Sequence, residues 1–491
     1  ACFNFTNTSL AVSSGRLKEI GIRKVMGGSR LQLILQFMGE NIATCALALG
    51  LGLLMAMWMV PAYSALWDFI DLKLSIGSNP EIFAFLGLLL LFTAVVAGAY
   101  PALYVSKFEP VSILRGTLKL GGSSLVSLIL LGFQYLFTVL ALISSLAFIG
   151  NAKYQETLDV GFKRDGVLSV LVDNSDAVKT FYNEARQIPN VSEASMTTQT
   201  IGRWTYSRLF RNGERELEMD MVDMSIDYMD MMEVELVDGR FFRPDLEEYD
   251  RRSAVLVNEE TVRQFGWEEP VGQVVQLDDT TRLNVVGVVK DFYMWGFWVP
   301  VPAMGIRLAN DDNLNFVTVA FPADKIQSVQ GGLEEIWQRQ IPNKPFDVDL
   351  EDELDEATLV NSNISLMFTF LGGLALILSS IGLFTLVSLN VIKRVKEIGI
   401  RKVLGARISS IVNLMNKPFV IVLIVASILG TVLAYLAVDA ILAMIFHYYK
   451  PMTIISVVVP LLGMFIISLG TSSSRVFKAA TDNPVKSLRY E

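Results

Sequence analysis

Six runs of apolar residues, each about as long as a bilayer core is thick, restrict the fold of this 491-residue chain more than any other feature. A helix needs about 20 consecutive apolar residues to cross the hydrocarbon region. The mean hydropathy of +0.44, with 52% hydrophobic residues, also favours a lipid environment. We therefore predict membrane helices over 41–60, 82–105, 125–149, 364–392, 418–442 and 453–470.

A seventh membrane helix is predicted at the start of the sequence. Residues 1–14 are apolar, carry no initiator Met and run directly into a basic segment. A signal peptide would need a charged region ahead of its apolar core, and none precedes this one. We therefore treat the chain as the C-terminal part of a longer protein.

The distribution of charge predicts how the chain is threaded through the membrane. Residues 151–360 hold 40 of the 50 acidic but only 20 of the 41 basic residues. The basic segment KEIGIRKV occurs twice, at 18–25 and at 396–403. If both copies face the cytoplasm, 19 of the 21 basic residues outside 151–360 are cytoplasmic, which satisfies the positive-inside rule. Only Lys73 and Lys450 then lie outside. This threading exports residues 151–360 as one large acidic domain.

The exported region has the pattern of a mixed α and β domain. Strand-like and helix-like runs alternate along it, with strands predicted at 166–173, 253–258 and 282–291 and helices at 176–189 and 324–340. Residues 351–363 start with acidic side chains, and no helix breaker separates them from the apolar run at Ile364. We expect this segment to be a helical stalk that continues into the membrane.

The segment KEIGIRKV occurs at 18–25 and again, unchanged, at 396–403. Arg16 and Gly27 recur as Arg394 and Gly405, at the same offset of 378 residues. Two predicted helices later, PVSILR at 110–115 is echoed by PVKSLR at 484–489, at an offset of 374. Chance does not explain two ordered matches, so we interpret them as an internal duplication.

The repeated segment has the pattern of an amphipathic helix on the inner membrane surface. Glu397 and Arg401, like Glu19 and Arg23, are four residues apart and can pair on its polar side. Gly399 and Gly405 are poor residues for a helix interior and suit a helix end or a close approach by another backbone. An apolar stripe is predicted from Ile400, Val403, Leu404, Ile408 and Ile411. The alternative, a basic flank that only orients the protein, leaves the repeated Glu, Ile and Gly residues unexplained.

Longer stretches around these repeats carry a resemblance to a known family. RLKEIGIRKVMGG and RVKEIGIRKVLGA each follow an apolar run. The exported region contains VDGRFFRPD at 237–245, AVLVNEETVRQFGWEEPVGQVVQL at 254–277 and NVVGVVKDFY at 284–293. In combination, these segments resemble the cytoplasmic segment and the periplasmic core domain of ABC transporter permeases of the MacB/FtsX type.

The resemblance implies an α-helical membrane protein with duplicated transmembrane units plus an α+β extracytoplasmic domain. Each unit would have four membrane helices, with the extracytoplasmic domain between the first and second. Residues 1–120 would hold the last three helices of one unit, and 121–150 the first helix of the next. The MacB-like core domain would span 151–360, and 361–491 would complete the second unit. A first helix and a first outer domain would lie upstream.

The resemblance also implies what the chain binds in the bacterial cytoplasmic (inner) membrane. In the family, the basic segment contacts a separate cytoplasmic ABC ATPase and relays its movement to the outer domain. The lipid bilayer and two ATPase copies are the expected partners, with a periplasmic adaptor left open and no nucleic acid. The matching positions are Glu19, Gly21, Arg23, Lys24 and Gly27, and in the second copy Glu397, Gly399, Arg401, Lys402 and Gly405.

We expect the chain to hold no cofactor or metal and to have no catalytic residues. It lacks the sequence G-x-x-x-x-G-K-[ST], so ATP is expected on the partner ATPase. The single histidine, His447, lies near the outer end of a predicted helix. Cys2 and Cys45 lie in apolar segments, so the three residues predict no metal cluster.

Three functions fit these features. The first is a permease that uses ATP hydrolysis on its partner to export or extract an amphiphilic substrate or a peptide. The second is an FtsX-like regulator of cell-wall hydrolases that transports nothing. The third is a membrane-anchored ligand sensor, although the cytoplasmic segments are too short for an output domain. The sequence does not identify the substrate.

Overall fold

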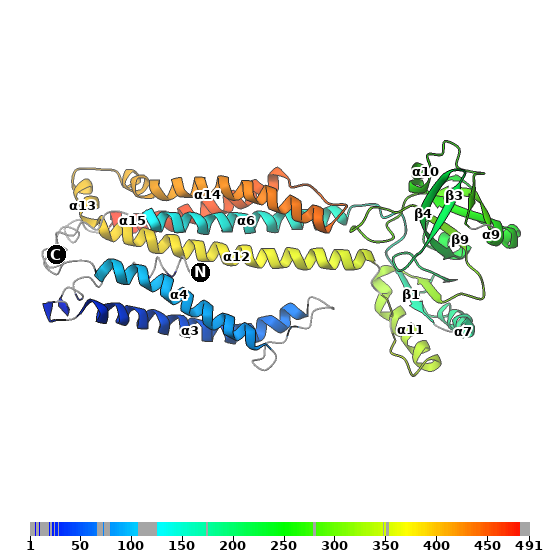
Figure 1. Cartoon of the computed structure of the whole chain (residues 1–491), viewed down its shortest axis with the longest axis horizontal. Helices are drawn as coiled ribbons and strands as arrows, with labels where there is room; N and C mark the ends of the chain where they lie inside the picture. The colour runs from blue at the N-terminus through cyan, green and yellow to red at the C-terminus, as the bar shows by residue number, and fades with distance from the viewer. Residues whose placement is uncertain are drawn as a thin grey trace. The chain divides into compact units, whose positions relative to one another are not determined.

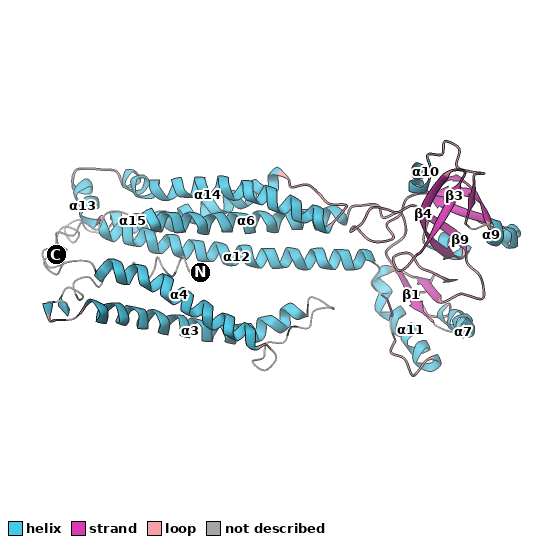
Figure 2. Ribbon diagram, viewed as in Figure 1, coloured by secondary structure: helices cyan, strands magenta, loops and turns pink. Residues whose placement is uncertain are grey.

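Two compact units make up the chain, for which we analysed a computed structural model. It describes residues 29–65, 79–106, 125–172, 175–277, 281–346 and 353–481, together with residues 5, 9, 19, 22, 23, 25–27, 72, 348 and 349. The helical unit comprises Ala1–Gly150, Ser362–Ile441 and Pro451–Glu491. The α+β unit comprises Asn151–Asn361 and Leu442–Lys450, and it contains all the strands that the structure describes (Figure 2).

Long helices dominate the helical unit, and α6, α12 and α14 extend into the residues of the α+β unit. Their bounds are α3 (Arg30–Ser64), α4 (Pro80–Ser106), α6 (Leu125–Gln155), α12 (Glu353–Lys393), α13 (Val395–Val403), α14 (Ile408–Ile445) and α15 (Ile454–Thr481). Within the described residues, five helices are long and apolar enough to span a membrane, and α4 adds the shorter stretch Pro80–Val95. The six predicted runs are therefore confirmed as helices. The predicted seventh lies almost wholly outside the described residues.

Helices α6, α12, α14 and α15 pack side by side (Figure 1). The Thr138 and Ser379 hydroxyls are 2.6 Å apart between α6 and α12, and the Phe148 and Phe368 rings stack at 5.1 Å. A Cβ atom at Gly430 of α14 would lie 2.9 Å from Val139 Cβ, so only glycine permits this approach to α6. Small residues and interhelical hydroxyl contacts are typical of helix packing in lipid.

The two copies of the repeat fold alike. Helices α3 and α14 begin at residues 30 and 408, separated by the 378 positions that separate the KEIGIRKV segments. Helices α4 and α15 begin at residues 80 and 454, separated by the 374 positions found for the Pro-Val-x-x-Leu-Arg segments. The helix pair that follows each basic segment is thus duplicated, although both Pro-Val-x-x-Leu-Arg segments lie outside the described residues.

The α+β unit contains a four-stranded sheet and a seven-stranded sheet. The first has the order β11-β1-β10-β2 and the second β5-β8-β6-β9-β4-β3-β7. The strands are β1 (Val167–Leu171), β2 (Glu193–Thr197), β3 (Tyr206–Asn212), β4 (Arg215–Met224), β5 (Leu236–Gly239), β6 (Ala254–Asn258), β7 (Val274–Gln276), β8 (Arg282–Val289), β9 (Met304–Leu308), β10 (Phe316–Ala320) and β11 (Val348–Asp349). The helices are α7 (Ser175–Ala185), α8 (Ile226–Met231), α9 (Glu247–Ser253), α10 (Glu259–Phe265) and α11 (Ile326–Gln340), with short 3-10 turns η1 (Pro244–Leu246) and η2 (Ala323–Lys325). The predicted strands correspond to β1, β6 and β8, and the predicted helices to α7 and α11.

Each sheet of the α+β unit has its own buried core. Helices α7 and α11 cover the four-stranded sheet, where Phe181 and Trp337 pack edge to face at 6.3 Å. In the seven-stranded sheet, all five residues of β6 are buried. Its alternate side chains enter two core clusters, Ala254 and Leu256 in one and Val255 and Val257 in the other, so both faces of the strand are covered. A strand buried on both faces is nearly continuously apolar, as the sequence AVLVN shows.

The segment Leu442–Lys450, between α14 and α15, packs within the α+β unit. The Phe446 and Trp298 rings stack at 4.9 Å, and the His447 main-chain N–H donates to the Phe297 carbonyl oxygen at 2.9 Å. The Val301 N–H donates to the Tyr448 hydroxyl at 3.1 Å. His447 thus lies in an aromatic contact at the end of α14, which sequence analysis did not foresee.

The predicted stalk is helical from Glu353 onward. Helix α12 runs without interruption over Glu353–Lys393, so it joins residues of the α+β unit to residues of the helical unit. Near its start, Asn361 Nδ2 donates to Gln155 Oε1 at the end of α6, at 2.8 Å. Residues 351 and 352 lie outside the described residues.

A buried ion pair fixes the segment after β5. The Asp250 side chain is fully buried, and its two oxygens accept from Arg240 Nη2 and Nη1 at 2.7 and 2.8 Å. The Arg243 main-chain N–H donates to the same carboxylate at 3.0 Å. Gly239, just before Arg240, has φ +77° and lies so close to Val286 that a Cβ would be 2.4 Å from its carbonyl oxygen. The turn in the sequence VDGR therefore places Arg240 beside Asp250.

We predict that Asp250→Asn lowers the free energy of unfolding by about 3 kcal/mol, because it breaks a buried ion pair and leaves the charge of Arg240 without its partner. Burial would raise the pKa of Asp250, but hydrogen bonds from Arg240 and the Arg243 amide outweigh it and hold the pKa below its usual range. The stabilisation is therefore complete above the unfolded pKa of about 3.9 and is lost as pH falls through the lower folded pKa. Thermal unfolding at several pH values tests this, with Asp245→Asn, in an exposed pair, as the control. An equal loss in both variants would contradict the prediction.

Candidate functional site in the two basic helical segments

The second basic segment forms a separate short helix, α13. Helix α12 ends at Lys393, and the Arg394 N–H is shared between the carbonyl oxygens of Asn390 and Val391, both at 3.1 Å. At the other end, the Gly405 N–H donates to Lys402 O at 3.0 Å and the Ala406 N–H to Arg401 O at 2.9 Å. Gly405 has φ +84°, so this is a Schellman turn, which favours glycine. The expectation that Gly405 marks a helix end is confirmed.

The described residues of the first copy share two features with the second. Gly27 has φ +93° and corresponds to Gly405. The Met26 N–H donates to Ile22 O at 3.0 Å, and in the second copy the Leu404 N–H donates to Ile400 O at 3.0 Å. Among the residues that the structure describes, no atom lies within 4 Å of a Cβ built at Gly27 or Gly405, so what calls for glycine at these positions is the positive φ and not a close approach.

The predicted charge pairs form in both copies. Glu397 Oε1 accepts from Arg401 Nη2 at 3.0 Å, and Glu19 Oε1 lies 2.6 Å from Arg23 Nη2. Both arginines remain about half exposed, at 48% and 47%. Each glutamate precedes its arginine by one helical turn, an orientation that also suits the helix dipole. Gly21 and Lys24 lie outside the described residues.

The apolar stripe predicted for this helix is wrong. Helix α13 ends at Val403 and α14 begins at Ile408, so the five predicted residues do not share one helix face. The periodicity fails because the turn at Gly405 redirects the chain. Ile398 and Gly399 face the protein and are buried, whereas Ile400, Val403 and Leu404 are exposed.

The exposed residues form the same surface in both copies. Ile400, Val403 and Leu404 correspond to Ile22, Val25 and Met26 at the repeat offset, and all six are exposed. Leu404 and Met26 are 79% and 83% exposed. We call each trio, together with its Glu–Arg pair, a coupling surface. An exposed apolar patch beside charged residues is typical of a protein contact.

Polar contacts connect α13 to the ends of the neighbouring helices. Lys402 Nζ donates to the carbonyl oxygen of Thr481, the last residue of α15, at 3.2 Å. Arg475 Nε of α15 donates to Ser388 Oγ of α12 at 3.0 Å. On α14, buried Asn416 donates from Nδ2 to Ser473 Oγ at 2.9 Å and accepts from Ser472 Oγ. These contacts connect α13 to α15, and α15 to α12 and α14.

We predict that Asn416→Ala lowers the stability of the helical unit by about 1–2 kcal/mol, because two serine hydroxyls lose their partner between packed helices. Thermal aggregation of the detergent-solubilised chain measures this effect. Asn413→Ala is the matched control, because Asn413 lies on the exposed side of the same helix. Equal midpoints for the two variants would show that the Asn416 contacts contribute nothing.

Metal-binding clusters do not occur among the residues that the structure describes. His447 packs its ring on Tyr448 at 4.8 Å, and half-buried Cys45 lies in α3. Cys2 lies outside the described residues.

Two family models match the chain. The FtsX-like permease C-terminal model matches residues 1–110 and 369–481, which contain both KEIGIRKV segments and the helix pair that follows each of them. The MacB-like periplasmic core domain model matches residues 129–336. Fold and matches together define a helical membrane protein with an α+β extracytoplasmic domain. The chain belongs to the ABC transporter permeases of the MacB/FtsX type.

Curated relatives extend these matches. The chain is 24% identical over 333 residues to the macrolide export ATP-binding/permease protein MacB of Bdellovibrio bacteriovorus, covering 64% of this chain and 49% of the relative. It is 27% identical over 225 residues to MacB 2 of Aeromonas hydrophila, covering 43% and 34%. The chain thus spans about half or less of the length of these relatives.

Solved structures also match the chain. The periplasmic region of MacB from Actinobacillus actinomycetemcomitans is 15% identical with a TM-score of 0.30, covering 41% of this chain and 95% of that one. The extracellular domain of the noncanonical ABC-type transporter YknZ is 16% identical with a TM-score of 0.29, covering 37% and 96%.

Proposed function

We propose that this chain is the permease subunit of an ABC transporter in the bacterial inner membrane. It couples ATP hydrolysis by a separate cytoplasmic ATPase to movement of the extracytoplasmic domain, for export or extraction of an amphiphilic substrate or a peptide. The observation that carries this proposal is the coupling surface, which has a matching exposed apolar trio, the same Glu–Arg pair and the same positive-φ glycine in both copies.

Two equal surfaces suit two equal partners. A dimeric ATPase presents each of its subunits once, so a single chain that binds both needs its docking surface twice. The family models matched here cover permease domains, and the sequence has no phosphate-binding G-x-x-x-x-G-K-[ST] segment. ATP hydrolysis is therefore assigned to the partner.

The helices give this coupling a physical route. Lys402 ties α13 to the end of α15, and Arg475 ties α15 to α12. Helix α12 is then continuous to Glu353 in the α+β unit. Helix α12 contains no proline, a common cause of sharp kinks, so displacement at one end can pass along it to the other.

Reconstitution tests the proposal. The chain and the ABC ATPase from the same operon are placed in nanodiscs, and ATP turnover is compared with that of the ATPase alone. Stable association and stimulated turnover support the coupling role, and failure to associate contradicts it. Stimulated turnover in sealed vesicles without substrate movement, together with control of a cell-wall hydrolase, would favour the regulator.

A further inference from the structure

A cavity of about 600 Å³ opens on the α+β unit where two tryptophans lie close together in the sequence. It is lined by Trp295, Trp298 and residues 299–302, together with Asp220 of β4 and Glu260 and Gln264 of α10. None of these residues belongs to a coupling surface, so what the cavity binds does not depend on the proposed ATPase contact.

The tryptophan side of this cavity packs on the residues that follow a membrane helix. Helix α14 is long and apolar enough to span a membrane, and its last five residues, 441–445, are all apolar. The next residue, Phe446, stacks its ring on Trp298 at 4.9 Å, and the Val301 N–H donates to the Tyr448 hydroxyl at 3.1 Å. Tryptophan and tyrosine concentrate at the level of lipid head groups, where both their rings and their polar groups are satisfied. Chain connectivity therefore places Trp298 at the membrane–water boundary.

Residues 296–302 form an apolar stretch on an acidic unit. The indole N–H of Trp298 is the only polar side-chain group in this stretch. Val299 is 43% exposed, and Pro300 is exposed beside it. The two prolines have no backbone N–H and the Val301 N–H is already bonded, so few donors here need water. An exposed apolar stretch marks a contact, and its packing against the end of α14 favours lipid as the partner.

Asp220 adds a carboxylate whose charge is not compensated. Its Oδ1 accepts from Ser207 Oγ at 2.8 Å, and its Oδ2 accepts from the Trp295 indole N–H at 3.1 Å. Both donors are neutral, and no lysine or arginine among the residues that the structure describes pairs with Asp220. Glu260, in contrast, lies 2.7 Å from Arg263. Each oxygen of Asp220 keeps a lone pair, so this carboxylate is held in place and can still accept from a cation.

Trp298 offers a donor and an aromatic face. Its indole N–H makes no hydrogen bond within the described part of the chain, so it can donate to a phosphate oxygen. An indole also attracts an ammonium group more strongly than the other aromatic rings do. The cavity thus combines an acceptor for a cation, a donor for an anion and an apolar border. These are the three parts of a zwitterionic phospholipid.

We propose that this cavity binds the head group of a phospholipid with a primary ammonium, of the phosphatidylethanolamine class, in the leaflet on the extracytoplasmic side. The ammonium donates to Asp220, and a phosphate oxygen accepts from the Trp298 indole N–H. The side chains of residues 299–302 lie among the first carbons of the acyl chains. The bound lipid anchors residues 295–302 at the membrane surface.

Quenching of Trp298 by brominated lipid tests this proposal. The full chain is placed in phosphatidylcholine nanodiscs that contain either phosphatidylethanolamine or phosphatidylglycerol, brominated near the head-group end of the acyl chains. The contribution of Trp298 is the difference in fluorescence between the chain and its Trp298→Phe variant. We expect the ethanolamine lipid to bind about tenfold more tightly than the glycerol lipid, because its ammonium makes a charge-assisted hydrogen bond. Equal quenching by both lipids, or no quenching of Trp298, would overturn the proposal.

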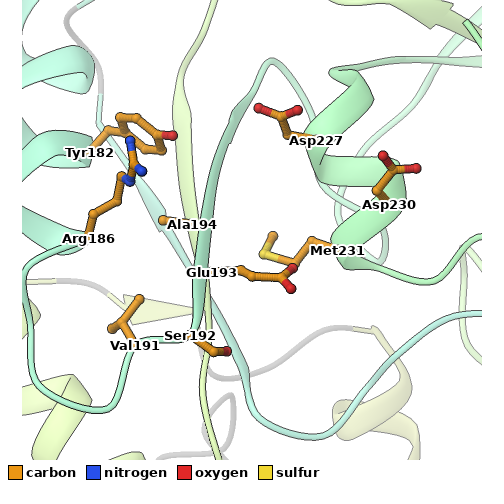
Figure 3. Close-up of a pocket in the computed structure, with 9 residues that line it drawn as sticks. All are labelled: Tyr182, Arg186, Val191, Ser192, Glu193, Ala194, Asp227, Asp230 and Met231. Atoms are coloured by element: carbon orange, nitrogen blue, oxygen red, sulfur yellow. The ribbon is translucent and has the colours of Figure 1, made fainter.

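Asp220→Asn should reduce this preference to less than about twofold. The amide oxygen can still accept from Trp295, and its nitrogen can donate to Ser207, so the variant should fold, as its thermal unfolding will show. The matched control is Asp227→Asn. Asp227 of α8 lines a different cavity of the same unit, and no tryptophan is among the described residues that line it (Figure 3). This control should keep the full preference, and equal losses in both variants would overturn the proposal.

A soluble head group distinguishes a lipid site from a site for a free amine. Glycerophosphoethanolamine carries the same ammonium and phosphate without acyl chains. Added at the concentration of the ethanolamine lipid, it should leave the quenching of Trp298 unchanged, because the apolar contact of residues 299–302 is missing. Displacement of the brominated lipid would assign the cavity to a soluble ligand and overturn the proposal.

Discussion

Replacing Arg23 and Arg401 together by glutamate should abolish binding of the ABC ATPase to this chain. Each arginine lies beside an exposed apolar trio, where a partner would bury it. Reversal leaves the partner's opposing charge unpaired and also places two glutamates one helical turn apart in each copy. A buried interfacial charge that loses its partner costs about 2–5 kcal/mol, or about 30-fold or more in affinity. Co-purification and ATP turnover measure the loss.

The single variants and one control variant show whether the effect is specific to the two coupling surfaces. Arg23→Glu or Arg401→Glu alone should weaken binding at one of the two coupling surfaces and leave partial stimulation. Arg407→Glu removes a nearby exposed base that the repeat does not contain, since the corresponding residue is Ser29. The Arg407→Glu chain should bind the ATPase like the wild type. All variants should insert into the membrane with the same orientation, because many other basic residues set it. If the double variant stimulates its ATPase normally, the basic segments only orient the protein.

Replacing Ala357 by proline should uncouple ATP hydrolysis from the outer domain. Ala357 lies one turn inside α12, where its N–H bonds the carbonyl of the residue four positions earlier. Proline removes that bond and clashes with the preceding turn, at a cost of about 3 kcal/mol or more, so the helix breaks or kinks there. The ATPase should still bind, because the coupling surfaces are untouched. Substrate movement per ATP hydrolysed should fall to background.

Ala357→Gly is the graded comparison, since it weakens the helix by about 1 kcal/mol and keeps the N–H. It should leave most of the coupling intact. Tryptophan fluorescence should show that the α+β unit is still folded in both variants, because its two sheets are formed by strands outside α12. Normal transport by Ala357→Pro would mean that residues 353–361 act as a passive connection.

Features with a local physical cause could be predicted from the sequence. The six apolar runs became helices because helix length in lipid is set by bilayer thickness and internal hydrogen bonding. The Glu397–Arg401 pair and the helix end at Gly405 followed from spacing and from glycine's freedom at positive φ. The duplication was visible because 378 positions separate identical segments, and α3 and α14 begin at that offset.

Contacts between distant residues were decided only by the tertiary structure. The pattern of Ile400, Val403 and Leu404 indicated a buried stripe, but burial depends on what packs against a helix, and here Ile398 and Gly399 face the protein. Strand order placed β2 at the edge of its sheet, where α8 packs against it, and this brings Glu193 close to Asp227 although neither residue has a distinctive local pattern. Phe446 meets Trp298 from 148 positions away, a contact that local propensity does not encode because it arises when separate segments bury a common surface.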